Sequence, residues 1–144
     1  MIEGLTTSGA MPVLQRLVQF TQARHQVLVN NIANLSTPYF KPHDLSVDSF
    51  QATLREAIEQ RRRTPNSTGS SLNMDDNREM RFTSGGIEVN PDYANNNILF
   101  HDQNNRDLER LMQNLAENTI VHRTSMELLR SEVITLQTAI RERV

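Results

Sequence analysis

The side chains best suited to chemistry are spread too widely to form a recognisable site. The four histidines are His25, His43, His101 and His122, and none shares a helix face with another at a metal-ligand spacing. His101 is followed by Asp102, but neighbouring residues in a strand point to opposite faces. No nucleophile motif accompanies them. The sequence therefore predicts no catalytic residues, no metal site and no cofactor, so we do not expect an enzyme.

Charge and composition argue against several classes of partner. The chain has 144 residues and a formal net charge of −2, which gives no field to attract nucleic acid or anionic lipid. The basic run 61–63 lacks the aromatic residues of a nucleic-acid patch and is interpreted as a solvated helix end. Gly85-Gly86 is not followed by the Lys-Ser/Thr pair of a phosphate loop. We therefore expect no nucleic-acid partner and no small-molecule substrate.

Two long amphipathic helices are predicted at the chain ends, over residues 11–35 and 105–143. In both, apolar residues recur at alternating steps of four and three, which is the spacing of a coiled-coil seam. His25 and His122 also fall on these lines and could meet if the helices pair. The predicted seam residues are Leu14, Val18, Leu28, Leu35, Leu108, Met112, Leu115, Met126, Leu129, Val133, Leu136 and Ile140.

Further apolar residues widen the stripe on each helix. They are Val13, Leu17, Phe20 and Val27 on the first helix and Leu111, Val121, Leu128 and Ile134 on the second. A two-stranded seam uses only two of every seven positions, so we expect each helix to contact more than one neighbour. One chain offers little for a second contact, which favours assembly with other chains.

A weaker, loop-rich insertion is predicted between the helices, over residues 36–104. It includes a short helix near 47–63, for which Asp48 is a candidate cap, and short strands at 80–83 and 97–100. The hydrophobic fraction of 37% and the lack of Trp indicate a thin core. We therefore predict one mainly α domain over 1–144, in which the terminal helices pair as an antiparallel coiled coil beside a small irregular or β insertion.

The segment NNIANLSTPYFK, residues 30–41, closes the first helix in an unusual way. Three asparagines surround apolar residues, although Asn is a poor residue for a helix interior. Their amides are therefore expected to bond the backbone or a neighbouring chain. An ordinary capped helix end before a proline turn is the alternative that this segment leaves open. The predicted assembly motif is Asn30, Asn31, Ile32, Ala33, Asn34, Thr37, Pro38, Tyr39 and Lys41.

This segment resembles the signature of bacterial flagellar rod and hook proteins. In that signature an Asn-Asn-(Ile/Leu)-Ala-Asn core is followed by Thr-Pro, a glycine, an aromatic residue and Lys. A second segment, FHDQNNRDLERLMQNLAENTIVHRTSMELLRSE, resembles the C-terminal region of a proximal rod protein of the same family. The chain departs from the pattern twice: the glycine expected after Pro38 is absent, and Gln103 stands where a glycine is usual.

The resemblance implies a structural subunit of the basal-body rod that polymerises with other rod proteins and with copies of itself, and that transmits torque to the hook for motility. It also implies passage through the type III export apparatus without a Sec signal peptide, and residence in the periplasmic rod. Contacts with that apparatus and with the MS-ring or export-gate adaptor at the rod base would follow. The alternatives are another rod protein of this family and a soluble helical-bundle adaptor or chaperone.

Overall fold

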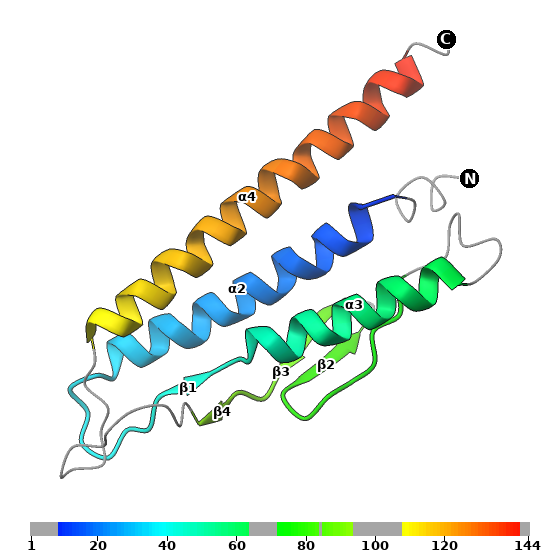
Figure 1. Cartoon of the computed structure of the whole chain (residues 1–144). Helices are drawn as coiled ribbons and strands as arrows, with labels where there is room; N and C mark the ends of the chain where they lie inside the picture. Colours follow the sequence, from blue (N-terminus) through cyan, green and yellow to red (C-terminus); the bar gives the residue numbers. More distant parts are fainter. Residues whose placement is uncertain (1–8, 64–71, 84, 94–107, 142–144) are drawn as a thin grey trace.

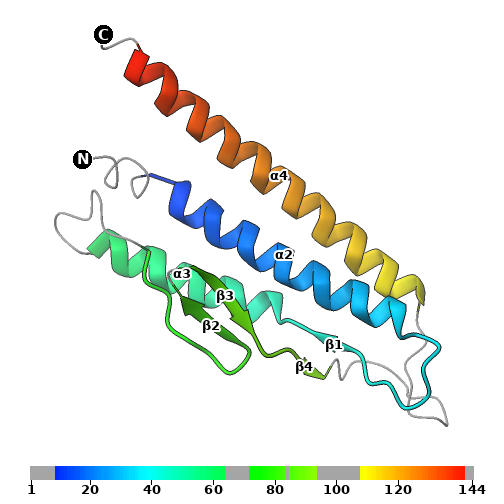
Figure 2. The ribbon, with the colours of Figure 1, turned by 180° about the vertical axis from the view of Figure 1, so that it is seen from behind.

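A computed structural model describes residues 9–63, 72–83, 85–93 and 108–141. Within these ranges the chain is mainly helical, with three helices and four short strands in the order α2, β1, α3, β2, β3, β4, α4. Helix α2 lies between the other two helices, with α4 along one side and α3 along the other (Figures 1 and 2). The predicted mainly α class with a small β part is confirmed.

Helices α2, Met11–Ala33, and α4, Leu108–Arg141, run side by side in opposite directions (Figures 1 and 2). Pro12 fits the first turn of α2 because its missing N–H would have no partner there. The end predicted for this helix at residue 35 was wrong by two residues, because Asn34 already caps it. Residues 105–107 and 142–143 of the predicted second helix lie outside the described ranges. The coiled-coil geometry of the pair stays a prediction.

Helix α3, Val47–Arg63, covers the range predicted for the short helix. Asp48 is not its cap. Ser46 is, because its Oγ accepts the N–H of Ser49 at 3.1 Å, which is the N3 bond of a capping side chain. The Phe50 ring of α3 stacks on the Phe20 ring of α2, with centroids 4.0 Å apart and planes 6° from parallel.

Two small antiparallel sheets complete the described part of the fold. Strands β2, Met80–Thr83, and β3, Gly86–Val89, form a hairpin, and β1, His43–Asp44, pairs with β4, Asp92–Tyr93. The predicted strand at 80–83 is thus confirmed, whereas 97–100 lies outside the described residues. Arg16 of α2 donates to Thr83 O at 3.0 Å and to Gly86 O at 3.4 Å, so it fastens the hairpin end to α2. Burial lowers the pKa of the Arg16 guanidinium.

The buried apolar core lies between α2, α3 and the hairpin. Its fully buried members are Phe20, Leu45, Phe50, Ala57, Leu72, Met74 and Met80. Val13 and Leu17 of α2 pack against this cluster. The second apolar row of α2 is therefore covered by α3 and the hairpin of the same chain. Our expectation that one chain offers little for a second contact was wrong for α2, because the insertion supplies most of the core.

Candidate assembly surface

The segment 30–41, which we call the joint segment, begins with the capped end of α2. Asn34 Nδ2 donates to Asn30 O and to Asn30 Oδ1, each at 2.9 Å. The backbone N–H of Thr37 then donates to Asn34 O at 2.9 Å, which turns the chain away from the helix. Asn30 and Asn34 therefore close the helix end locally, as in an ordinary capped terminus.

Asn31 has a different role, because it is buried and bonds a distant part of the chain. Its side chain is only 2% exposed. Its Oδ1 accepts the His43 N–H at 3.1 Å, while its Nδ2 donates to the His43 carbonyl. The amide thus pairs with the start of β1 as a neighbouring strand would. Arg24 reinforces the same contact with two hydrogen bonds to Asp44, at 2.7 and 2.8 Å.

The turn after Pro38 contains an unusual backbone conformation. Tyr39 stands where the rod and hook signature has a glycine, and its φ is +62°. This left-handed region suits glycine, because a Cβ there crowds the following carbonyl oxygen. The Tyr39 side chain is 75% exposed. The turn therefore forms without the glycine, and the backbone of Tyr39 is strained in it.

The rest of the predicted assembly motif lies close to the surface. Ile32 is half-buried, whereas Ala33, Thr37, Pro38 and Lys41 are exposed. Asn31 is thus the buried residue of the motif, Ile32 and Asn34 are half-buried, and the other motif residues are exposed. The buried part holds the fold together, and the exposed part is available for contact with another molecule.

The predicted seam divides into buried and exposed residues. On α2, Leu28 is fully buried and Leu14 and Val18 are half-buried. Leu35, which lies beyond the end of α2, is also half-buried. On α4, one line of residues seven apart is half-buried: Leu115, Leu129 and Leu136, with His122 between them. The remaining predicted seam residues of α4 are 39–54% exposed; they are Leu108, Met112, Met126, Val133 and Ile140.

Small polar residues on α4 take the place of the exposed ones at the contact with α2. Asn118 and Ser125 are 3% and 2% exposed, and Ser125 stands one position before the predicted seam residue Met126. The Nδ2 group of Asn118 donates to Thr21 O of α2 at 2.8 Å. His122 Nδ1 lies 2.8 Å from the Thr21 hydroxyl, whereas His25 is exposed, so the two histidines do not meet. The short side chains of Asn118 and Ser125, spaced seven residues apart, were the sequence signal for the contact with α2.

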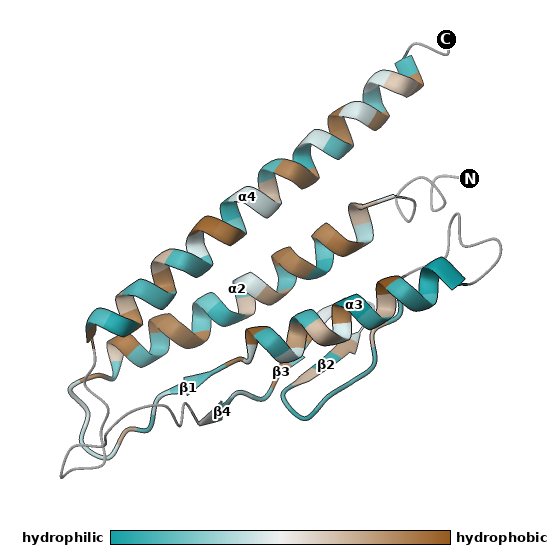
Figure 3. Cartoon of the chain, viewed as in Figure 1, coloured by the Kyte–Doolittle hydropathy of each residue, from teal (hydrophilic) through white to brown (hydrophobic). Residues whose placement is uncertain are grey.

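This placement of α4 turns much of its apolar surface outward. Hydrophobic turns follow α4 along its whole length (Figure 3). We call its exposed large residues the outer row: Leu108, Met112, Ile120, Val121, Met126, Leu128, Val133, Ile134 and Ile140. A helix of 34 residues is about 50 Å long. An apolar surface of this extent on a small chain is typical of a protein-protein contact site.

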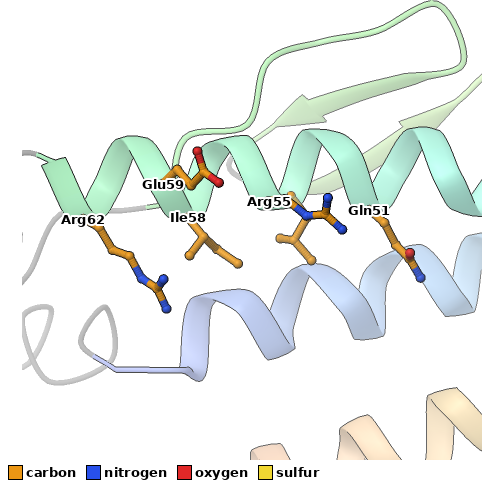
Figure 4. Close-up of a pocket in the computed structure, with 6 residues that line it drawn as sticks. Gln51, Arg55, Ile58, Glu59 and Arg62 are labelled. Atoms are coloured by element: carbon orange, nitrogen blue, oxygen red, sulfur yellow. The ribbon is translucent and has the colours of Figure 1, made fainter.

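A shallow groove of about 300 Å³ also runs beside α3 (Figure 4). It is lined by Gln51, Leu54, Arg55, Ile58, Glu59 and Arg62, which all belong to that one helix. Glu59 forms an ion pair with Arg63 at 3.8 Å. Groups from separate elements do not converge there in the described part of the chain, so the groove shows no arrangement for catalysis.

The described residues also bear on metal sites and on membrane-spanning helices. No group of three or more His, Asp or Glu residues within those ranges could hold a metal ion. The same ranges contain no helix long and apolar enough to cross a membrane. His43 instead contacts Pro91 O at 3.2 Å, and His101 lies outside the described residues.

Comparison with known proteins identifies similar chains. No family model matches the sequence. The chain is 30% identical over 119 residues to the flagellar basal body rod protein FlgB of Borrelia hermsii, covering 78% of this chain and 82% of the relative. It is 27% identical over 132 residues to the protein of the same name from Yersinia enterocolitica, and 28% identical over 132 residues to that of Yersinia ruckeri. Each of these two alignments covers 87% of this chain and 88% of the relative.

Proposed function

The chain belongs to the family of flagellar basal body rod proteins named FlgB, and on that premise we propose that it polymerises with other rod proteins and with copies of itself. Its family makes it a structural protein of the basal body rod. The polymer would transmit torque from the motor to the hook. In this proposal the chain acts through contacts between helices.

The outer row of α4 is the observation that carries this proposal. Successive residues of a helix turn by about 100°, so Val121 and Leu128 lie on one side of the contact with α2, and Met112 and Met126 lie on the other side. Further helices could therefore pack against α4 while α2 stays in place. Helices that bury apolar stripes on two sides form bundles of more than two helices. The outer row would therefore be buried in the assembled rod.

The exposed residues of the joint segment would add a second contact. Tyr39 projects from a turn that is held on its inner side by the Asn31 amide and the Arg24–Asp44 ion pair. Exposed aromatic residues on a fixed backbone are favourable contact residues, because little entropy is lost when they bind. We place the predicted assembly motif in this role.

The same proposal includes a route and a place for the subunit. It would pass through the flagellar type III export apparatus and reach the periplasmic part of the rod. At the rod base it would contact the export apparatus and the MS-ring or export-gate adaptor. The family membership supports this route.

The assembly proposal is tested by placing a charge on the outer row. Met126→Asp changes a residue that is 46% exposed, so the isolated chain should keep its helical content. We expect a strain carrying it to be non-motile and its basal bodies to lack a complete rod, because a carboxylate would be buried at the new contact. Ser131→Asp, at an exposed polar position of the same helix, is the matched control. Normal motility with Met126→Asp would overturn the proposal.

A further inference from the structure

Three residues form a polar layer at the contact between α2 and α4, which we define as Thr21, Asn118 and His122. The Thr21 hydroxyl lies 2.8 Å from His122 Nδ1, and Asn118 Nδ2 donates to the Thr21 carbonyl at 2.8 Å. Thr21 is 2% exposed and Asn118 is 3% exposed. Polar groups this deeply buried are costly unless their hydrogen bonds are made. The layer therefore depends on the two helices being aligned as they are.

The Thr21 hydroxyl has more hydrogen-bond partners within reach than it has hydrogens. Its Oγ1 atom lies 2.9 Å from Leu17 O and 3.0 Å from Val18 O in the preceding turn of α2. Oγ1 and His122 Nδ1 can share a hydrogen bond in either direction, according to which ring nitrogen carries the proton. A leucine facing Thr21 could form no such bond.

The apolar residues at the contact do not select one alignment by themselves. Those on α2 repeat every seven residues as Leu14, Thr21 and Leu28, and those on α4 as Leu115, His122 and Leu129. Each line contains one polar member, and the structure brings these two members together. A slide of seven residues, about 10 Å, would keep leucine near leucine elsewhere. It would also place each polar member against a leucine.

We propose that the polar layer fixes the alignment of α4 along α2 and excludes the two alignments that lie one heptad away. Helix α4 lies on the side of α2 opposite to α3 and the hairpin (Figures 1 and 2). Within the described elements, its position along the helix axis is therefore decided at its contact with α2. A single polar residue in an apolar seam is known to specify alignment in this way. The inference does not depend on the rod function.

The alignment can be measured as a distance between two spin labels on the full-length chain. The sequence contains no cysteine, so Gln26→Cys and Glu132→Cys, both at exposed positions, give unique attachment sites. With Thr21 opposite His122, the labels lie roughly fifteen residues apart along the pair, and a slide of seven residues changes that offset by about 10 Å. Dilution with unlabelled chain ensures that only distances within one molecule are measured.

The first variant removes the layer with Thr21→Val and His122→Leu. We expect the wild-type chain to give one dominant distance and this variant to give at least one further distance, in a tenth or more of the molecules. Thr124→Val is the matched control, because Thr124 donates to Ile120 O of its own helix at 2.9 Å but is exposed. The control should keep the wild-type distance.

The second variant moves the layer instead of removing it. Thr21→Leu combined with Leu28→Thr offers His122 a hydroxyl one heptad further along α2. We expect α4 to slide by seven residues and the label distance to shorten. An unchanged distance in this variant, or several distances in the wild-type chain, would overturn the proposal. Loss of the circular-dichroism helix signal in both variants would also overturn it, because the layer would then be needed for folding and not for alignment.

Discussion

Asn31 is the residue of the joint segment whose side chain is most deeply involved in the fold. Asn31→Ala would leave the N–H and the carbonyl of His43 without the partners they now have. We expect the free energy of unfolding to fall by about 2–3 kcal/mol, as measured by urea unfolding. Asn30→Ala is the control, because Asn30 is exposed and its amide oxygen bonds only within the helix end. It should cost less than about 1 kcal/mol. Equal losses would contradict the role given to Asn31.

A substitution at Tyr39 should raise the stability of the chain, whereas Asn31→Ala should lower it. Tyr39→Gly removes the Cβ that crowds the backbone at φ +62°, a cost of about 1–2 kcal/mol for residues other than glycine. Part of the gain is lost because glycine has more freedom in the unfolded chain. We therefore expect a net stabilisation of up to about 1 kcal/mol in thermal unfolding. Tyr39→Ala keeps the Cβ and should give no gain, so a similar gain from both changes would show that the ring, and not the backbone, is responsible.

Among the elements, α4 is held to the rest of the chain differently from α2 and α3. It contributes none of the fully buried apolar core, and its two buried residues, Asn118 and Ser125, are small and polar. Opening α4 therefore exposes less apolar surface than opening α2. We expect amide hydrogen exchange in the free chain to give α4 an opening free energy at least about 1 kcal/mol below that of α2 near Phe20. Equal protection of both helices would indicate a single cooperative unit.

The presence of a helix could be predicted from the sequence where the apolar residues follow a periodic pattern. The spacing of Phe50, Leu54 and Ile58 was enough to place α3, and unbroken heptads placed α4. The core could not be predicted in the same way. Leu72 and Met74 are buried in a segment outside the helices and strands, and such residues leave no period to detect. The sequence therefore predicts a loop-rich, weak insertion, although the insertion supplies most of the core.

Only part of the candidate site could be predicted from the sequence, and the reason again lies in what a periodic pattern can show. Heptad spacing identifies which residues share a line, but two adjacent lines on α4 both fit it. Apolar spacing favours the line through Met112 and Met126, whereas α2 contacts the line through Asn118 and Ser125. Short side chains allow a close approach and Asn118 adds a hydrogen bond, and neither effect is visible in hydropathy. In the joint segment, the bond from Asn31 to His43 depended on a chain return that has no sequence signal.

At the scale of the whole molecule, one side of the chain holds the buried core and the other side exposes apolar residues of α4. Helix α2 buries one face against α3 and the hairpin and another against α4, so it is covered on both. Among the described residues, helix α4 is covered where it contacts α2, and its outer row is exposed. The surface proposed for assembly is therefore separate from the residues that stabilise the fold. Substitutions on the outer row should affect association without unfolding the chain.

The force that drives this association can be predicted from the charges on α4. Its described residues include four acids and four bases: Glu109, Glu117, Glu127, Glu132, Arg110, Arg123, Arg130 and Arg141. The helix is thus neutral overall, and the whole chain has a net charge of only −2. Charge attraction between copies should be weak and screened by salt, whereas burial of the outer row should not be.

Self-association of the purified chain should therefore respond to temperature more than to salt. In sedimentation experiments, raising NaCl from about 50 to 500 mM should change the association constant less than about threefold, because screening acts on charges and leaves apolar burial intact. Cooling should weaken the association, since the hydrophobic contribution falls at low temperature. Met126→Asp should associate less at every salt concentration, because it places a charge within the outer row. A tenfold loss of wild-type association on adding salt would instead assign the contact to charged side chains.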